Sequence, residues 1–145
     1  MPRNKWHSQS PEETIERGRL IAKSLRPGML IALIGDLGSG KTTFVKGLAL
    51  GLGVQDSREV KSPTFVIFHI YQGHIPLYHF DLYRLDETSD LEGIGIEEFL
   101  ADPNVVSVVE WADRIPQVLK QAHLRITIIR TGELKRTIEL ERHEQ

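Results

Sequence analysis

The segment that most constrains this chain is a short glycine-rich stretch, GDLGSGKT, which runs from Gly35 to Thr42. It fits the pattern G-x-x-x-x-G-K-[ST] without a mismatch. The residues just before it, MLIALI, form a continuous apolar run that is typical of a fully buried strand. The residues after it, from Lys41 to Leu52, predict a helix with one apolar side. This order of strand, loop and helix predicts a phosphate-binding loop, or P-loop.

Each position of the loop has a physical role in binding a phosphate. Glycines let the backbone wrap around the anion with successive N–H groups pointing inward, and the following helix presents its positive N-terminal end. We expect Lys41 to reach the β- and γ-phosphates and the Thr42 hydroxyl to bind Mg²⁺. The residues predicted to hold the nucleotide here are Gly35, Asp36, Leu37, Gly38, Ser39, Gly40, Lys41 and Thr42. The alternative is a chance match, in which the glycines form an ordinary turn or a degenerate site.

Strand and helix patterns alternate along the rest of the chain, which predicts an α/β fold. Ser10, Pro11 and Glu13 are typical of a helix start, whereas residues 1–9 are polar and are predicted to be loose. Further strands are predicted at residues 64–71, 75–80, 105–109, 124–130 and 135–141, and helices at 91–100 and 115–121. We therefore expect residues 1–145 to form a single P-loop domain. It would have a mostly parallel central sheet with helices on both faces and a C-terminal antiparallel hairpin.

Composition excludes several other classes of protein. Hydrophobic residues make up 40% and charged residues 26% of the chain, which is typical of a globular protein and argues against disorder or a coiled coil. The net charge of -2 argues against a strongly basic nucleic-acid module. Without cysteine, disulfides, Cys-ligated zinc and thiol nucleophiles are excluded. No apolar run is long enough to span a bilayer, and the N-terminus has no apolar segment after its charges, so we expect a cytoplasmic location and no membrane contact.

Three polar residues outside the loop are candidates for completing a nucleotide site. Glu110 follows the valine-rich run 105–109 and is the candidate for a second Mg²⁺ anchor, with a solvated strand-end glutamate as the alternative. Asp81 follows an apolar strand, at the end where α/β sheets bind ligands. It is a candidate for polarising the attacking water or for holding a metal-bound water, with a structural ion pair to Arg84 as the alternative. Thr64 lies where nucleotide hydrolases carry a segment that senses the γ-phosphate, although position alone slightly favours a plain turn.

Aromatic and imidazole side chains near these acids have simpler interpretations. Trp111 could stack on a base, but a buried core tryptophan is commoner. His69, His74 and His79 alternate along the predicted hairpin, and surface histidines are favoured over a metal site because no carboxylate or cysteine completes a ligand set. The guanine-reading pattern Asn-Lys-x-Asp is missing after the loop, which favours adenine.

Four motifs, taken together and in this order, resemble one family. They are GDLGSGKTTF, SPTF, YHFDLYRL and VVEWADR, and the resemblance extends from about Thr14 to Arg114. The family is that of the bacterial ATPases of tRNA threonylcarbamoyladenosine biosynthesis, TsaE, formerly YjeE. The resemblance implies a P-loop ATPase that uses ATP and Mg²⁺, is weak alone and works with two partner proteins, TsaB and TsaD. Those partners attach the threonylcarbamoyl group to the adenosine next to the anticodon, and the resemblance implies that ATP hydrolysis resets or licenses them.

The resemblance also implies roles for individual residues. Catalytic roles fall on Lys41, on the switch-like Thr64 and on Asp81, the acid of an H-x-D-x-Y-R element. Glu110 matches the metal-binding acid, beside Thr42. Nucleotide contacts extend from the loop to Thr43, Trp111 and Thr14, the last of these near the adenine.

Two other functions stay open as alternatives. A small-molecule kinase on the same fold would need an acceptor pocket and usually an arginine-bearing lid, and no arginine-rich insertion stands out. A non-catalytic, nucleotide-gated interaction module is disfavoured by the intact Lys41, Thr42 and Glu110. Contact with tRNA is expected to be indirect.

Overall fold

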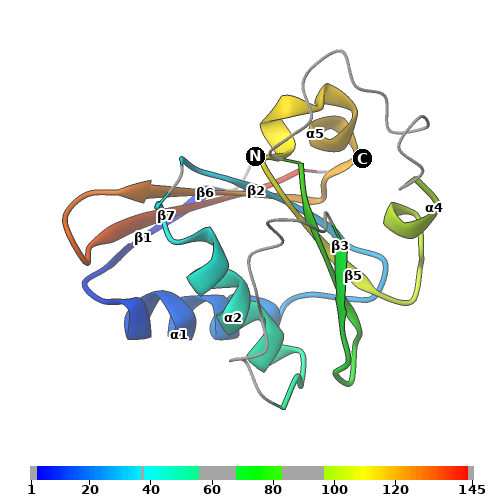
Figure 1. Ribbon diagram of the computed structural model, residues 1–145, viewed down its shortest axis with the longest axis horizontal. Helices are drawn as coiled ribbons and strands as arrows, with labels where there is room; N and C mark the ends of the chain where they lie inside the picture. Colours follow the sequence, from blue (N-terminus) through cyan, green and yellow to red (C-terminus); the bar gives the residue numbers. More distant parts are fainter. Residues whose placement is uncertain (1–2, 37, 56–67, 83–96, 144–145) are drawn as a thin grey trace.

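The structure, a computed structural model, describes residues 3–36, 38–55, 68–82 and 97–143 of the 145-residue chain. Its strands form one seven-stranded sheet in the order β1-β7-β6-β2-β5-β4-β3 (Figure 1). The strands are β1 (Arg3–Ser8), β2 (Leu30–Ile34), β3 (Phe68–Tyr71), β4 (Leu77–Asp81), β5 (Val106–Glu110), β6 (Leu124–Arg130) and β7 (Arg136–Arg142). The helical elements are α1 (Pro11–Ala22), α2 (Lys41–Gly51), α4 (Glu97–Leu100), the 3-10 turn η2 (Ala112–Arg114) and α5 (Pro116–Gln121).

The sheet is mixed, which corrects the expectation of a mostly parallel sheet. Strand β2 pairs in parallel with β5 and β6, and β5 pairs in parallel with β4. The outer pairs β1–β7, β6–β7 and β3–β4 are antiparallel. Only the four central strands are therefore parallel. The outer strands are antiparallel because β7 and β4 each return directly beside the preceding strand, through short turns, and β1 adds to the free edge of β7.

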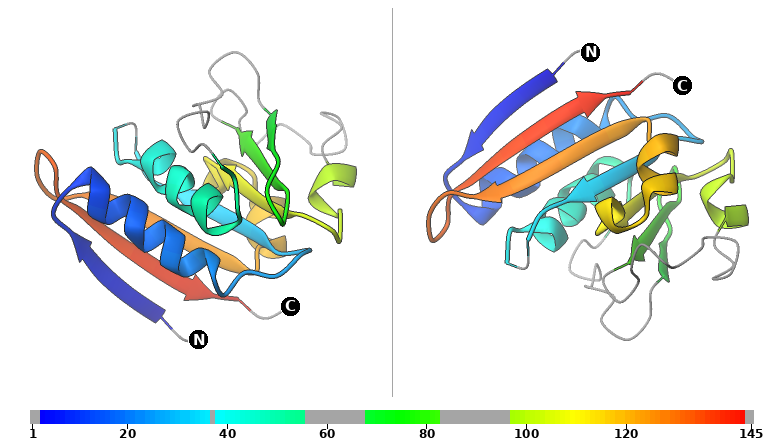
Figure 2. Two further views of the ribbon diagram at one scale, coloured as in Figure 1. Left: turned by 90° about the horizontal axis from the view of Figure 1, so that it is seen from below. Right: turned by 90° about the horizontal axis from the view of Figure 1, so that it is seen from above.

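Helices cover both faces of the central strands, as predicted for an α/β fold (Figure 2). Ile31 and Leu33 of β2 belong to the core beneath α1 and α2, which includes Phe44. Leu30 and Ala32 belong to the core on the opposite face, which α5 and η2 cover. Because both faces of β2 are buried, its sequence is continuously apolar and does not alternate.

The two long helices, α1 and α2, pack closely against each other. A side chain at Gly18 of α1 would place its Cβ 2.6 Å from the carbonyl oxygen of Phe44 in α2. Only a glycine allows this approach of the two backbones. The start of α1 is as predicted, because the Ser10 side chain accepts a hydrogen bond from the Glu13 N–H and Pro11 opens the helix. The packing of α1 therefore fixes the position of α2, whose first residue closes the glycine-rich loop.

The polar N-terminal segment forms a strand, whereas the sequence predicts it to be loose. Strand β1 pairs antiparallel with β7 at the edge of the sheet. Trp6 packs against the core, and the Arg17 guanidinium lies 4.6 Å from its ring centroid. Arg3 and Lys5 pair with the glutamates opposite them on β7. Strand β1 lies at the edge of the sheet and is held by its backbone pairing with β7 and by the packing of Trp6. Its other residues can therefore be polar, and such a sequence looks like that of a loose terminus.

Some predicted elements lie partly outside the described residues. The strand predicted at residues 64–71 is seen from Phe68, and the helix predicted at residues 91–100 is seen from Glu97. Residues 64–67 and 91–96 are outside the described ranges. Within the described residues, the strand before the glycine-rich loop and the helix after it are confirmed within one residue of their predicted bounds.

Candidate functional site

The glycine-rich loop lies at the carboxyl end of β2, between that strand and α2 (Figure 1). Gly38 and Gly40 have φ angles of 77° and 101°, in the left-handed region that favours glycine. The Ser39 N–H donates to the Asp36 carbonyl over 3.0 Å and closes a tight turn. A Cβ at Gly35 would lie 2.7 Å from the Ile128 carbonyl oxygen of β6, so the loop begins pressed against the sheet. The loop glycines are therefore required by this backbone.

The Lys41 side chain lies inside this loop. Its ammonium donates hydrogen bonds to the Gly35 and Asp36 carbonyls, the latter over 3.0 Å. The same ammonium lies 3.9 Å from the centroid of the Trp111 ring, which is a cation–π contact. Loss of water around the amine lowers the pKa of Lys41 below its usual value, and the carboxylate of Glu110 is the largest opposing influence.

Two buried carboxylates end neighbouring parallel strands beside Lys41. Asp81 is the last residue of β4 and Glu110 the last of β5, and the two are opposite each other in the strand register. Their relative exposures are 8% and 3%. Both lie close enough to Lys41 to favour its charged form electrostatically. The structure thus brings together four of the predicted residues: Lys41, Asp81, Glu110 and Trp111.

His79 is fully buried, which corrects the prediction that it is a surface histidine. Its Nε2 hydrogen-bonds the Glu110 carboxylate, and its Nδ1 has no hydrogen-bond partner among the described residues. The prediction was wrong because His79 lies on the same face of β4 as Leu77, and this face is packed into the buried core beneath α1 and α2. The lack of a complete ligand set argued against a metal site, but it did not show whether the imidazole is exposed. His79 therefore fixes the orientation of the Glu110 side chain.

Replacing His79 by alanine is expected to destabilise the fold. The substitution leaves the buried Glu110 carboxylate without its imidazole partner, and loss of one partner of a buried pair costs about 3–5 kcal/mol. Urea denaturation of the His79→Ala variant measures this loss as a lower transition midpoint. His69→Ala is the matched control, because His69 faces His79 across the β3–β4 register and is only half-buried. Equal stability losses in the two variants would contradict the assignment.

The structure places the remaining predicted residues in different surroundings. Thr42 and Thr43 lie in the first turn of α2 and are partly exposed, beside the loop. Thr14 is buried in α1, and its Oγ1 lies 2.7 Å from the Ser8 Oγ, so this hydroxyl is engaged within the protein. Its contact with the adenine stays a prediction. Leu37, Thr64 and Arg84 lie outside the described residues.

Trp111 adopts a left-handed backbone conformation, with φ 60°. Among described residues other than glycine, it alone has a positive φ. Such conformations cost free energy in a bulky residue and are concentrated at functional sites. Trp111 directly follows Glu110 and precedes η2, so the turn places its ring over the Lys41 ammonium. The indole is half-buried and packs against the core that α5 and η2 cover, so the expected core tryptophan is found only in part.

Sequence reasoning missed Arg136, the first residue of β7. Its guanidinium donates to the Ser39 carbonyl over 2.7 Å and to the Gly38 carbonyl over 3.2 Å. An arginine that follows a turn and opens an amphipathic strand carries no motif, so no sequence signal distinguishes it. The contact arises because β7 is brought beside the loop by the order of the sheet.

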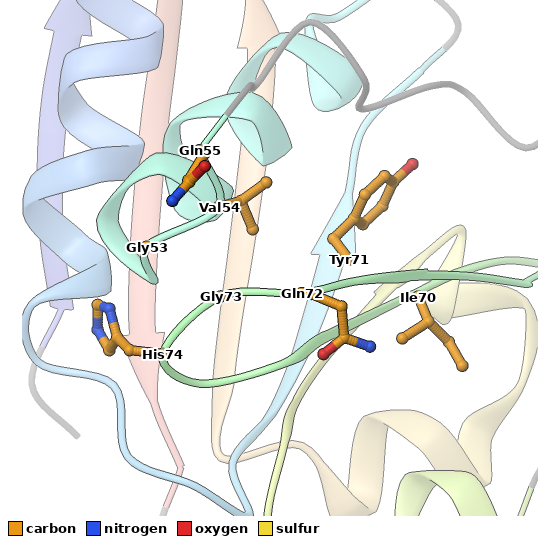
Figure 3. A pocket seen from close by; sticks show the side chains of 8 residues that line it. All are labelled: Gly53, Val54, Gln55, Ile70, Tyr71, Gln72, Gly73 and His74. Carbon is orange, nitrogen blue, oxygen red and sulfur yellow. The ribbon is translucent and has the colours of Figure 1, made fainter.

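A groove of about 670 Å³ lies at the opposite end of α2 from the loop (Figure 3). It is formed by the segment after α2 and by the turn between β3 and β4. Its lining residues are Gly53, Val54, Gln55, Ile70, Tyr71, Gln72, Gly73 and His74. This groove contains none of the predicted nucleotide-binding residues and is therefore separate from the candidate site.

The fold and the candidate site define an α/β protein with a glycine-rich loop and paired carboxylates at the carboxyl ends of its central strands. The family model described as "Threonylcarbamoyl adenosine biosynthesis protein TsaE" matches residues 8–138. The chain belongs to this TsaE family, whose members take part in tRNA threonylcarbamoyladenosine biosynthesis. The resemblance of the four motifs to this family is thus confirmed.

Individual relatives agree with the family assignment. The chain is 45% identical over 139 residues to the tRNA threonylcarbamoyladenosine biosynthesis protein TsaE of Bacillus subtilis, covering 95% of this chain and 85% of that protein. It is 40% identical to the TsaE of Treponema pallidum, covering 83% and 87%. The crystal structure of Bacillus subtilis YdiB superposes with a TM-score of 0.76 at 38% identity, covering 96% of this chain and 84% of that one. No helix in the described part of the chain has the length and apolar character needed to cross a bilayer.

Proposed function

We propose that this chain is an Mg²⁺-dependent ATPase that acts in the threonylcarbamoyl modification of the adenosine next to the anticodon of tRNA. The observation that carries the proposal is the convergence of the Lys41 ammonium and the two carboxylates of Asp81 and Glu110 at one glycine-rich loop. The family assignment supplies the pathway. Cationic and carboxylate groups around an amide-lined loop are the groups that phosphoryl transfer to water requires.

The residues of the site fit a magnesium nucleotide. Glu110 and Thr42 offer oxygen ligands, which Mg²⁺ prefers. Among the described residues, no group of three or more His, Asp or Glu is arranged to hold a metal by itself. Mg²⁺ usually binds through one or two carboxylates together with substrate phosphates, so an incomplete protein cage fits this use. When bound, Mg²⁺ would neutralise charge that develops on the phosphates.

The side chains of the site have distinct proposed roles. Lys41 would exchange its hydrogen bonds with the Gly35 and Asp36 carbonyls for bonds with phosphate oxygens. The Gly35–Thr43 segment would provide backbone amides and the Thr42 and Thr43 hydroxyls. Asp81 would accept a hydrogen bond from the attacking water and hold it in line. Thr64, outside the described residues, is proposed to contact the same water.

The second buried acid is proposed to be a metal anchor, and the Glu110→Gln variant tests this role. The amide keeps the shape of the side chain and its contact with His79 but removes the negative charge. We expect the apparent affinity for Mg²⁺ in the ATPase reaction to fall about tenfold, as ligand-shell substitutions in metal sites do. A Mg²⁺ titration of phosphate release at fixed ATP measures this shift. An unchanged Mg²⁺ requirement would contradict the role of Glu110.

The chain is proposed to act with TsaB- and TsaD-type partner proteins, to be a weak ATPase alone and to contact tRNA only indirectly. The family assignment supports a role in the pathway, and the partners follow from the resemblance of the motifs. A cytoplasmic location is proposed on the same basis.

Product analysis separates the ATPase from its alternatives. The chain is incubated with ATP and Mg²⁺, with and without the partner complex, and inorganic phosphate is measured. We expect release of phosphate without any added acceptor, and faster release with the partners. A phosphorylated small molecule in place of phosphate would indicate a kinase. Turnover equal to background in both conditions would indicate a nucleotide-gated interaction module.

A further inference from the structure

Arg136 joins the β6–β7 turn to the back of the glycine-rich loop. Its Nε and Nη2 donate to the Ser39 and Gly38 carbonyls over 2.7 and 3.2 Å. Its Nη1 donates to three carbonyls of the turn, those of Gly132, Glu133 and Lys135, over 2.8–3.3 Å. A Cβ on Gly40 would lie 3.3 Å from the Arg136 Nε, so the side chain also covers the outer side of Gly40. One guanidinium therefore bridges two segments that are far apart in the sequence.

The direction of these hydrogen bonds matters for the loop. In a trans peptide the carbonyl and the following N–H point to opposite sides of the backbone. Holding the Ser39 carbonyl against Arg136 directs the Gly40 N–H away from Arg136. Holding the Gly38 carbonyl likewise orients the Ser39 N–H, which donates to the Asp36 carbonyl and closes the turn. A loop that binds an anion needs its amides on one side and its carbonyls on the other, and Arg136 occupies the carbonyl side.

The charge of Arg136 also favours the conformation in which the loop binds an anion. Carbonyl oxygens carry partial negative charge, and a loop whose amides converge on a ligand collects its carbonyls on the opposite side. The guanidinium is always protonated and offers five N–H donors in a planar fork. It neutralises the two loop carbonyls and adds a positive charge behind the loop. A lysine would carry the charge but could not span both the loop and the turn.

We propose that Arg136 is a positioning residue for nucleotide binding, which holds the glycine-rich loop in its anion-binding conformation from the carbonyl side. This inference rests on the proposed function, because it concerns the same loop. It adds a residue from the C-terminal strand pair, which lies outside the four motifs of the sequence. It predicts that loss of Arg136 weakens nucleotide binding more than it slows the chemical step, since Arg136 contacts backbone and not the reacting atoms.

The test compares Arg136→Ala and Arg136→Lys with a matched control, Arg130→Ala. Arg130 belongs to the same strand pair and is exposed, and its guanidinium donates to the Gly132 carbonyl and, within the described part of the chain, to no carbonyl of the loop. Isothermal titration with a non-hydrolysable ATP analogue and Mg²⁺ measures the Kd, and phosphate release measures KM and kcat. Circular dichroism checks that each variant is folded. Should Arg136→Ala fail to fold, Arg136→Lys provides the comparison.

We expect Arg136→Ala to raise Kd and KM about tenfold, which is the effect of losing a hydrogen bond to a charged group, with kcat changed less than about threefold. Arg136→Lys should recover less than half of the loss on a logarithmic scale. Millimolar guanidinium ion added to Arg136→Ala should lower its KM toward that of the parent, which a merely structural role would not produce. Arg130→Ala should bind like the parent.

Three results would overturn the inference. The first is parent-like affinity in Arg136→Ala while Lys41→Ala loses binding, which leaves the proposed function intact. The second is an equal loss of affinity in Arg130→Ala, which would show that the effect comes from the net positive charge of the strand pair and not from the contacts of Arg136 with the loop. The third is parent-like binding in Lys41→Ala, which would contradict the proposed function and remove the basis of the inference with it.

Discussion

Replacing Lys41 by alanine is expected to abolish detectable nucleotide binding or turnover. The Lys41 ammonium lies within the glycine-rich loop, where it donates hydrogen bonds to the Gly35 and Asp36 carbonyls. Burial lowers the pKa of Lys41 and the neighbouring carboxylates oppose this shift, so the amine lies in a desolvated site where its attraction to a phosphate is stronger than in water. Removal of one such preorganised group typically lowers the rate about 10²–10³-fold. Titration with the ATP analogue and phosphate release measure the two effects.

Lys46→Ala is the matched control for this experiment. Lys46 lies on the same helix and is partly exposed, and it follows the first helical turn that adjoins the loop. We expect Lys46→Ala to bind and hydrolyse ATP like the parent. Equal hydrolysis by parent and Lys41→Ala would show that the loop is a structural turn, and the assignment of the site would then be wrong.

Replacing Asp81 by alanine is expected to separate binding from catalysis. Asp81 ends β4 beside Glu110, so its carboxylate lies at the edge of the sheet where the loop also lies. As the group that positions the attacking water, it should contribute little to nucleotide affinity but strongly to kcat. General-base catalysis contributes about 10²–10⁴-fold, and we expect kcat to fall within this range while the Kd for the ATP analogue changes less than about threefold.

Asp113→Asn provides the control for Asp81→Ala. Asp113 is exposed on η2 and also lies near enough to Lys41 to raise its pKa. The Asp113→Asn variant therefore removes an acid from the surroundings of Lys41 without removing a candidate catalytic group. We expect its kcat to stay within about threefold of the parent value. An Asp81→Ala variant that turns over ATP as fast as Asp113→Asn would exclude Asp81 as the water-positioning acid.

The strand, the loop and the following helix could be predicted because local signals agree there. The continuous apolar run of β2 reflects burial on two faces, and the glycine spacing reflects the positive φ angles of Gly38 and Gly40. The positions of Asp81 and Glu110 were also predictable, since each directly follows an apolar strand. Neighbouring parallel strands then bring the two strand ends together.

Other parts of the site depend on contacts between distant segments and have no local signal. His79 was expected at the surface because no ligand set is apparent around it, and the sequence does not reveal that its face of β4 is packed beneath the helices. Arg136 reaches the loop only through the order of the strands, which places β7 two strands from β2. The edge strand β1 is polar and becomes ordered through pairing with β7. In each case the position of the residue in the fold is set by contacts between segments distant in the sequence, and residue type alone does not reveal these contacts.

The binding of the nucleotide at the glycine-rich loop can be tested directly by ¹⁵N-resolved nuclear magnetic resonance with Mg²⁺ and a non-hydrolysable ATP analogue. We expect the amide signals of Gly38, Ser39 and Gly40 to shift and to saturate with the analogue in the parent chain, and to stay unchanged in Lys41→Ala. Unshifted loop amides in the parent, with changes confined to Gly53 and Gly73 in the groove beyond α2, would contradict the account.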